Sequence, residues 1–569
     1  MTRPACRTRR VPDSTHQLQL RTRFGTHTRA LIVDGHATAR QMLAAQLRNM
    51  GASQVVQCAK AHEARQHAAT RPFEIVLCEQ RLGDGTLGQD LIDDLRQRKL
   101  ITLSTIVMVL SANSTYPVVA EAAELAIDGF LIKPYSLGDL EDRLLAAFVR
   151  KDSMKEIATL IESGDHAGAL AQCEQRFQAR GAYWTHAARL GAELAIRLEK
   201  LPVATAMFNA VIDDKAVPWA RLGIARVMDA SGKPAAAEST IKNLLGAHPT
   251  YVDAYDVLGR IYTDRGDYAA AAETFRRAVE VTPHSVARNQ KYGILVFYTG
   301  DQAESMKILG QVVDRGGLLS PDFDHHVLLL LAVDAFKQRQ PEALGELRTQ
   351  LQKALEEQQL SSQAPRAEPG AAVADPQALL RRLQRYAGLL DALLATLRGD
   401  NAQALALLET AQKSLSENET AVDAAIALLL VLSTLCQANV FIPQAPAWVR
   451  QAGLRYCTNK QVTEMLARAC EGFDSLAEPV RAAHAHINSV TRDALGAAVA
   501  GQPRQAVLQL IEAVEATRNI KLHEVAVATL ERHKGRIDNP EVLQDRLDAL
   551  RVHCGAHTGA LLHTTLQGL

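Results

Sequence analysis

Four polar side chains end or follow short apolar runs in the first quarter of the chain. Asp34 ends ALIVD, Glu79 follows IVLC, Ser111 follows TIVMVL, and Lys133 follows GFLI. Such runs are typical of buried parallel strands, which lack the alternation of polar and apolar residues. Because the carboxyl ends of parallel strands share one edge of a sheet, we expect the four groups to lie close together. Two carboxylates, a hydroxyl and an ammonium suit phosphoryl chemistry.

Alternating strand and helix patterns position these groups. Between residues 29 and 150, five strand-like runs each precede a helix-like run, the last being LGDLEDRLLAAFVR. Five such units predict a parallel sheet with helices on both faces, because right-handed crossovers make the fold doubly wound. We therefore expect an α/β doubly wound domain at residues 29–150.

At these residues the domain resembles the response-regulator receiver family, with its flavodoxin- or CheY-like fold. LIVDGH stands where the family has an acidic pair, and CEQRLGDG where it has the phosphoacceptor aspartate. VLSA and FLIKP match the hydroxyl and lysine motifs. The resemblance implies that Glu79 takes the acceptor position and that Asp34 and Gly35 take the acidic pair, which with the acceptor holds magnesium. It further implies that Ser111 is the hydroxyl that follows the phosphate, that Lys133 is the countercharge of the phosphate, and that Phe130 is the aromatic rotamer switch. Lys133-Pro134 is a candidate cis peptide.

Two of these positions depart from the family pattern. Glu79 replaces the aspartate, which moves the carboxylate outward by about 1.5 Å, one carbon–carbon bond, although in-line transfer tolerates little misplacement. Gly35 replaces the second acid, which weakens any Mg²⁺ site. We therefore predict a pseudo-receiver with a degenerate magnesium site, no metal and no cofactor. Glu79 either mimics an acyl phosphate, with about −1 charge against nearly −2, or merely neutralises Lys133 at a retired site.

Composition limits the classes of function. The 569 residues are too many for one core, and 47% apolar with only 5% aromatic residues favours helix over strand. Lys plus Arg and Asp plus Glu both number 63, so no net charge attracts nucleic acid or anionic membrane. The eight cysteines form no CxxC pair, and no apolar run is long enough to span a bilayer. We expect a cytoplasmic protein with reduced thiols.

The first 28 residues carry six arginines and one acid. This composition predicts a disordered basic arm at residues 1–28. The arm is either a tail that touches phosphates or a solvated extension, and we favour the solvated extension. Nucleic acid is accordingly not the partner we expect.

A repeat begins after residue 150. The segment Val252–Ser285 resembles the tetratricopeptide repeat at its signature positions, which are Tyr255, Leu258, Gly259, Tyr262, Gly266, Tyr268, Ala271 and Phe275. Shifts of the repeat length reach the turn glycines Gly164, Gly232 and Gly300. The fold class is thus an N-terminal α/β domain followed by an all-α solenoid of paired helices.

Helix periodicity places one face of each first helix on the concave surface of the array, where such arrays usually hold partners. Mixed charge with a few aromatics on that face suits a protein segment better than nucleic acid. The predicted partner-binding surface consists of Trp219, Leu222, Arg226, Asp253, Asp256, Arg260, Asp264, Gln290, Ile294, Phe297 and Tyr298.

The predicted divisions after the receiver-like domain follow from composition. Residues 151–360 form the repeat array, and the Pro- and Ala-rich residues 361–377 form a flexible loop. Residues 378–569 form degenerate helical repeats, with Gly399 and Gly501 at repeat turns. The histidines near the C-terminus fit a frayed polar end better than a metal site.

No nucleophile–base pair and no phosphate-binding glycine loop is apparent, so we do not expect an enzyme. The architecture resembles the VieB-like regulators, which implies a signalling adaptor that binds another response regulator, a sensor kinase or a cyclic-di-GMP phosphodiesterase. One rival is a phosphorylatable response regulator; others are a purely structural scaffold and a nucleic-acid-linked regulator that uses the basic arm. A homodimer through Val118–Leu125 and Gly138–Phe148 also fits the receiver resemblance.

Overall fold

The computed structural model of the chain describes residues 28–83, 88–97, 99–112, 127–215, 217–283, 285–315, 317–319, 323–363, 376–415 and 422–554. The predicted basic arm lies outside these ranges except for Thr28. Most of the predicted loop at 361–377 and the helix predicted around Val118–Leu125 also lie outside them. The histidine-containing C-terminal end lies outside beyond Cys554.

The N-terminal domain contains a five-stranded parallel sheet with strand order β2-β1-β3-β4-β5. This order confirms the doubly wound fold, because the chain starts at an inner strand and proceeds outward in both directions. The strands are β1 (Arg29–Val33), β2 (Gln54–Cys58), β3 (Ile75–Glu79), β4 (Ile106–Ser111) and β5 (Gly129–Ile132).

Of the helices that the structure describes, two pack on each face of this sheet. One face and its helices, α2 (Ala37–Met50) and the first half of α6 (Leu137–Glu162), share a core that contains Ile32, Leu47 and Leu144. The other face and α3 (Ala61–Thr70) and α4 (Gly88–Gln97) share a second core, which contains Leu31, Ala64 and Leu91. Successive strand residues point to opposite faces, and both faces are apolar because both are covered.

Helix α6 continues past the domain boundary predicted at residue 150 and reaches Glu162. It begins at a capping box, in which the Ser136 side chain accepts from the Asp139 N–H and the Asp139 carboxylate accepts from the Ser136 N–H. Its second half belongs to the next core, where Met154 and Ile157 pack with Ala169, Leu170 and Cys173. One helix therefore connects the sheet to the first repeat without an intervening loop.

The predicted repeat helices follow in antiparallel pairs. Gly259 lets two helices approach, since an added Cβ would lie 2.6 Å from the Phe275 ring. The predicted turn glycines, Gly164, Gly232, Gly266 and Gly300, have positive φ, which glycine adopts without strain. The helices are α7 (His166–Ala179), α8 (Trp184–Arg197), α9 (Leu201–Asp214), α10 (Pro218–Ala230), α11 (Pro234–Ala247), α12 (Val252–Asp264), α13 (Tyr268–Val281), α14 (Val286–Thr299), α15 (Gln302–Arg315), α16 (His326–Lys337) and α17 (Pro341–Gln363).

The rest of the described chain is also helical. Gly399 and Gly501 again have positive φ at the turns where degenerate repeats were predicted. The elements are α18 (Pro376–Leu397), α19 (Asn401–Ser414), α20 (Val422–Gln437), α21 (Ala445–Tyr456), α22 (Lys460–Ala469), α23 (Asp474–Val499), α24 (Pro503–Thr517), α25 (Ile520–His533), the 3₁₀ turn η1 (Lys534–Arg536) and α26 (Pro540–Arg551).

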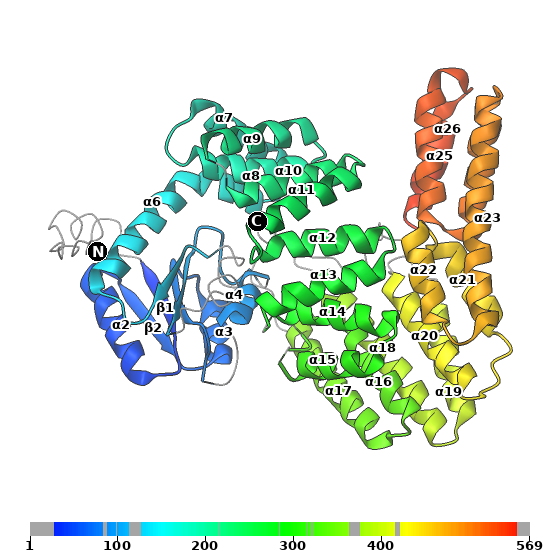
Figure 1. Cartoon of the computed structure of the whole chain (residues 1–569), viewed down its shortest axis with the longest axis horizontal. Helices are drawn as coiled ribbons and strands as arrows, with labels where there is room; N and C mark the ends of the chain where they lie inside the picture. Colours follow the sequence, from blue (N-terminus) through cyan, green and yellow to red (C-terminus); the bar gives the residue numbers. More distant parts are fainter. Residues whose placement is uncertain are drawn as a thin grey trace.

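Figure 1 shows how the parts of the molecule are arranged. The sheet lies at one side, and α6 rises from it to the repeats that begin with α7. Helices α12–α18 form the middle of the molecule, and α23, α25 and α26 project from the opposite side (Figure 1). From the second half of α6 onward, the helices contribute to three large successive cores, whose buried residues span 154–227, 222–480 and 487–554.

Candidate functional site

The structure brings the predicted polar groups to one edge of the sheet. Asp34 directly follows β1, Glu79 ends β3, Ser111 ends β4 and Lys133 directly follows β5. The register explains this arrangement, because Glu79 pairs with Leu110 and Ser111 pairs with Ile132, so the strands end nearly level. Asp34 and Ser111 are buried. The site is therefore set by where each buried strand stops.

Lys133 contacts both carboxylates of the site. Its ammonium donates to Asp34 Oδ2 at 2.9 Å and also forms an ion pair with Glu79 Oε2. The other Asp34 oxygen, Oδ1, accepts from the His36 N–H at 2.8 Å. Both acids are thus bound to the same cation, which is itself mostly buried with 24% of its side chain exposed.

The electrostatics of the two carboxylates differ. Burial opposes ionisation of Asp34, but hydrogen bonds from Lys133 and the His36 N–H lower the pKa of Asp34 overall. Burial, together with the adjacent Asp34 carboxylate, raises the pKa of Glu79 despite Lys133. Burial also disfavours the Lys133 cation, but Glu79 and Asp34 outweigh it and raise the pKa of Lys133. Asp34 is therefore the firmly ionised partner of Lys133, whereas Glu79 takes up a proton more readily.

Ser111 and Phe130 occupy the positions expected for the hydroxyl and the aromatic residue. The Ser111 hydroxyl donates to Gln80 Oε1 at 2.5 Å. Phe130 is half-buried on β5 and packs against the core beneath α3 and α4. The Lys133-Pro134 peptide is cis, as predicted. Gln80 thus holds the hydroxyl that the family resemblance places beside a phosphate.

The donor set does not fit a magnesium ion. Gly35 supplies no carboxylate, and a Cβ at residue 35 would lie 3.0 Å from the Gly83 backbone nitrogen. The two carboxylates that remain both contact Lys133, whereas Mg²⁺ requires near-octahedral oxygen ligands. Among the described residues no cluster of three or more His, Cys, Asp or Glu could hold a metal. The carboxylates of this site therefore offer a metal fewer ligands than a complete acidic pair would.

Two residues of the site, Gln80 and Tyr135, were not predicted from the sequence. Gln80 follows Glu79 directly, and its amide reaches Ser111 because the chain turns after β3. Tyr135 follows the cis peptide, and burial raises the pKa of its hydroxyl, which has no hydrogen-bond partner within the described parts of the chain. The adjacency of Gln80 to Glu79 and of Tyr135 to Lys133-Pro134 was the only signal available for either residue.

Ion pairs between successive repeats occupy part of the predicted partner surface. Arg226 pairs with Glu193 at 2.5 Å, Arg260 pairs with Asp229 at 2.9 Å, and Arg288 pairs with Asp256 at 2.7 Å. In each pair, the first helix of one repeat contacts the first helix of the preceding repeat. These charges therefore fix the stacking of α8, α10, α12 and α14, and are less available to a partner.

The predicted surface residues on α14 lie inside the molecule. Gln290, Ile294, Phe297 and Tyr298 are each 3–8% exposed. Tyr298 donates to or accepts from His326 at 2.8 Å, and Gln290 Oε1 accepts from the Asp324 N–H at 3.1 Å. Their neighbours come from this same chain, so a partner cannot reach them in this conformation.

The remaining predicted surface lies on α10 and α12. Leu222 is also buried, whereas Trp219 and Asp253 are half-buried and Asp264 is exposed. Burial, with Asp256 nearby, raises the pKa of Asp253. The guanidinium of Arg189 lies 5.3 Å from the centre of the Trp219 ring. Trp219, Asp253 and Asp264 are thus the predicted residues with the most accessible side chains outside the ion pairs.

The cysteines of the described chain are free thiols. Cys58, Cys78, Cys173, Cys457, Cys470 and Cys554 are buried, and Cys436 is partly buried. Burial raises the pKa of Cys58 to about 11 and that of Cys173 to about 12, so these thiols are not reactive thiolates. Of the helices that the structure describes, none combines the length and apolar character needed to cross a membrane.

Comparison with known proteins identifies the N-terminal domain. The family model for the response regulator receiver domain matches residues 30–145. The KDP operon transcriptional regulatory protein KdpE of Escherichia coli (strain K12) is 30% identical over 138 residues, which make up 24% of this chain and 59% of that protein. Residues 30–145 are therefore a response regulator receiver domain.

Solved structures resemble different parts of the chain. The chemotaxis response regulator CheY4 of Vibrio cholerae is 21% identical, with a TM-score of 0.20, and the match covers 21% of this chain and 98% of that one. The C-terminal part of a TPR repeat-containing protein from Cytophaga hutchinsonii is 15% identical, with a TM-score of 0.32, over 45% of this chain and 93% of that one.

Proposed function

We propose that this protein is a non-catalytic signalling adaptor. In this proposal the receiver domain is a pseudo-receiver that takes no phosphoryl group, and the helical array binds and modulates a partner signalling protein. The receiver domain and the repeat array support a role in signal transduction through protein–protein contact. The loss of phosphotransfer and the binding of a partner are our inferences.

The bridging position of Lys133 carries this proposal. A phosphoryl acceptor must be free to attack and must be accompanied by a cation that neutralises the transferred group. Here the acceptor position holds Glu79, whose carboxylate is already bound to Lys133, and Lys133 also binds Asp34. In this proposal no metal supplies that charge, because Gly35 removes one acid and the Gly83 backbone lies beside the place of its side chain.

Glu79 can also hold the receiver in one state. A carboxylate paired with Lys133 places negative charge where an acyl phosphate would place it, and it does so without phosphorylation. In the proposed function, this pair keeps the domain in a fixed signalling conformation. The alternative, that the pair is inert and serves only the fold, predicts that partner affinity does not depend on Glu79.

The partner that we propose is another response regulator or a sensor kinase, with a cyclic-di-GMP phosphodiesterase as one candidate. The accessible part of the array around Trp219, Asp253 and Asp264 carries mixed charge beside an aromatic ring, which suits a protein segment. The relative in Escherichia coli is described as a transcriptional regulator, but this chain spans only 59% of its length. We therefore do not extend its role in transcription to this chain.

The first test is phosphorylation of the intact chain. Incubation with acetyl phosphate and Mg²⁺, followed by intact-mass spectrometry, should give no phosphoryl adduct on the wild-type protein. The double substitution Gly35→Asp and Glu79→Asp restores an aspartate at both positions where the sequence differs from the receiver family. It is the matched gain-of-function control. We expect an adduct from this double variant only if the loop at Gly83 moves aside. A stable adduct on the wild-type receiver domain would overturn the pseudo-receiver assignment.

The second test concerns the partner. Affinity purification of the full chain from its native cell should retain a signalling protein, and the affinity of that protein can then be measured with Glu79→Ala. Weaker binding supports a phosphate-mimicking Glu79. Unchanged binding by Glu79→Ala supports the inert site and leaves the array as the sole determinant of binding. Capture that depends on residues 1–28 and weakens with salt would instead favour the nucleic-acid alternative.

A further inference from the structure

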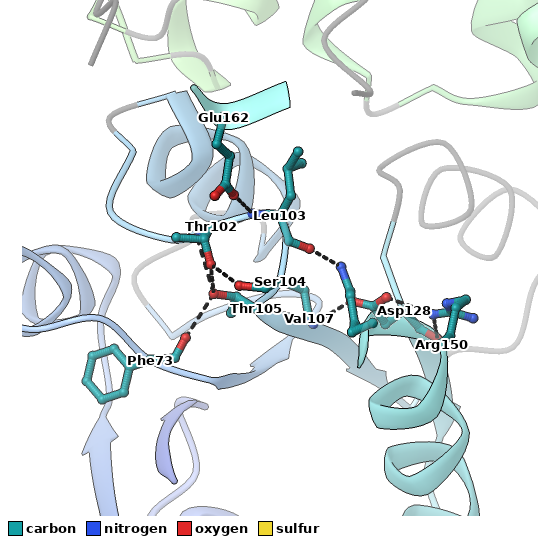
Figure 2. A network of polar contacts seen from close by, with 10 residues as sticks. Phe73, Thr102, Leu103, Ser104, Thr105, Val107, Asp128, Arg150 and Glu162 are labelled. Carbon is teal, nitrogen blue, oxygen red and sulfur yellow. Dashed lines mark hydrogen bonds and ion pairs between the residues drawn. The ribbon is translucent and has the colours of Figure 1, made fainter. Parts of the chain in front are cut away.

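Helix α6 is fixed to the receiver domain at the end of the sheet opposite the Lys133 site. Asp128 precedes β5, and its Oδ1 accepts from Arg150 Nη2 at 2.7 Å. Lys151 Nζ lies 3.2 Å from Asp128 Oδ2 and donates to the Leu103 carbonyl at 2.6 Å. Figure 2 shows Asp128 between β4 and the helix that carries Arg150. We call Asp128, Arg150, Lys151, Leu103 and Glu162 the base clamp.

A second contact holds α6 further along its length. The Leu103 N–H donates to Glu162 Oε1, in the last turn of α6. Lys151 and Glu162 are separated by roughly 16 Å along the helix, at 1.5 Å per residue. Contacts at two such distant points restrict both the direction and the rotation of α6. Glu162 reaches down to Leu103 in Figure 2.

The turn that contains Leu103 is held by its own hydroxyl groups. Thr105 Oγ1 donates to the Phe73 carbonyl at 2.9 Å and accepts from the Thr102 N–H at 3.2 Å. The Thr102 and Ser104 hydroxyls lie 2.7 Å apart (Figure 2). The backbone groups of Leu103 that bind Lys151 and Glu162 are therefore fixed to the sheet. A turn with this much internal bonding transmits displacement better than a flexible loop would.

Strand β5 connects the base clamp to the Lys133 site. Asp128 lies before the strand and forms two hydrogen bonds with Val107 of β4. The Asp128 N–H donates to the Val107 carbonyl at 2.7 Å, and the Val107 N–H donates to Asp128 Oδ2 at 2.9 Å. Lys133 lies after the strand, and its N–H donates to the Ser111 carbonyl at 2.7 Å. The strand is only four residues long, so a shift at one end is carried to the other.

We propose that β5 mechanically couples the Lys133 site to the repeat array through the base clamp. When Lys133 is bound to Asp34 and Glu79, β5 is fixed at its carboxyl end and Asp128 holds Arg150 and Lys151 at the other. When the Glu79 half of this pairing is lost, β5 loosens although Lys133 still contacts Asp34, the clamp loosens with it, and the packing of α6 on α7 weakens. The inference goes beyond the proposed function, because it requires neither a partner nor the loss of phosphotransfer.

Hydrogen-exchange mass spectrometry on the full chain tests this coupling as a double-mutant cycle. The four proteins are wild type, Glu79→Ala, the clamp variant Arg150→Met with Lys151→Met, and the triple variant. In peptides from residues 155–179, we expect Glu79→Ala to accelerate exchange about threefold or more. When Glu79→Ala is added to the clamp variant, exchange should accelerate in β4 and β5. In residues 155–179 the triple variant should exchange at the same rate as the clamp variant. Lys155→Met, on the exposed side of α6, is the control and should behave as wild type.

Two results would overturn the proposal. One is unchanged exchange in residues 155–179 after Glu79→Ala, while β5 accelerates. The other is an acceleration of equal size with and without the clamp, which would mean that another route carries the effect. Peptides from α2 and from α12–α15 report whether the receiver domain and the repeat array of each variant are folded, and both should exchange as in wild type. If the clamp variant fails this check, Arg150→Gln with Lys151→Gln replaces it. No phosphoryl donor is present, so the outcome is independent of the phosphorylation test.

Discussion

At the scale of single residues, the receiver site consists of one ammonium group between two carboxylates. Asp34 is fully buried and Glu79 has 13% of its side chain exposed, so neither acid is well hydrated. Two carboxylates at such short range repel each other unless a cation lies between them. Lys133 therefore stabilises both acids at once. Loss of the Lys133 charge should destabilise the site more than loss of the charge on either acid.

Removal of Lys133 should destabilise the receiver domain more than removal of the Glu79 charge. Lys133→Met leaves two buried carboxylates without a cation, which we expect to cost about 2 to 4 kcal/mol. Glu79→Gln removes one member of the repulsive pair and keeps Lys133 bound to Asp34, so we expect a cost below about 1 kcal/mol. Hydrogen exchange in peptides from residues 29–83 of the full chain measures both effects. Equal costs for the two variants would show that Lys133 does not act on both acids.

The sequence predicted those residues of the site whose positions follow from the end of a strand. Asp34, Glu79, Ser111 and Lys133 follow from four apolar runs, because parallel strands that stop level bring their next residues together. The contact between Gln80 and Ser111 and the approach of Gly83 to Gly35 depend on the path of the loop after β3. Loop paths are not encoded in hydrophobic periodicity, so these two features could not be predicted.

At the scale of elements, the close approach of paired helices depends on small residues at defined positions. Gly259 on α12 faces the ring of Phe275 on α13, and an added methyl group would lie 2.6 Å from it. Gly246 on α11 is also helical, but nothing lies within 4 Å of the place of its Cβ. Substituting each glycine by alanine therefore distinguishes the effect of packing, at Gly259, from the effect of helix propensity, at Gly246.

We expect Gly259→Ala and Gly246→Ala to change stability in opposite directions. Gly259→Ala overpacks the seam and should cost about 1 to 3 kcal/mol. Gly246→Ala should stabilise the array by about 0.5 to 1 kcal/mol, because alanine is the better helix former. Urea denaturation followed by tryptophan fluorescence is suitable, since Trp184, Trp219 and Trp448 all lie in the helical region. A stabilising Gly259→Ala would contradict the packing seen here.

The positions of the repeat helices could be predicted, but the exposure of their faces could not. The register of Tyr255, Gly259 and Phe275 predicted the helix pair α12–α13 correctly, since the signature reports contacts within one repeat. Ile294 and Phe297 were assigned to a partner surface, yet they are buried in the core that extends to Val480. Contacts with distant helices determine that burial. A local repeat pattern contains no information about them.

The start of α16, where His325 packs against Tyr386 of α18, should weaken in acid. His325 is buried, and burial, with Arg382 nearby, lowers its pKa to about 4; burial also lowers the pKa of His326. Between pH 6.5 and 4, His325 is protonated in the unfolded chain but mostly neutral in the folded chain. The free energy of unfolding therefore decreases as the pH falls through this range. The loss from His325 reaches about 3 kcal/mol at pH 4.

Urea denaturation at pH 7.5 and pH 4.5 measures this dependence. His325→Gln cannot be protonated but can still donate to the Leu318 carbonyl, which His325 contacts at 2.9 Å. The variant should therefore lose less stability between the two pH values than wild type does. An identical loss in both proteins would place the acid sensitivity elsewhere in the chain.

At the scale of the whole molecule, distant parts of the sequence are joined by continuous packing. The Tyr268 hydroxyl donates to the Gln461 carbonyl at 2.9 Å, and Arg468 contacts the Tyr298 carbonyl. Helix α22 thus closes onto α13 and α14, although it follows them by nearly 200 residues in sequence. The receiver domain is joined to this body through α6, whose two halves belong to different cores.

The orientation of the receiver domain should therefore depend on the continuity of α6. Lys155→Pro removes a backbone donor in the middle of the second half of the helix and clashes with the preceding turn, which costs about 3 kcal/mol locally. Because the two halves have separate cores, we expect both the sheet and the repeats to stay folded while the angle between them varies. Small-angle X-ray scattering should then show a larger radius of gyration and a broader distance distribution.

Lys155→Ala is the matched control for this substitution, because it removes the same exposed side chain but keeps the helix intact. Its scattering profile should equal that of the wild-type chain. If Lys155→Pro also scatters as wild type does, the contact between Leu103 and Glu162 holds the two bodies together even across a broken helix. Adding Glu162→Gln to Lys155→Pro separates these cases, since only then should the distance distribution broaden. The order in which the two restraints fail thus identifies which one sets the position of the receiver domain.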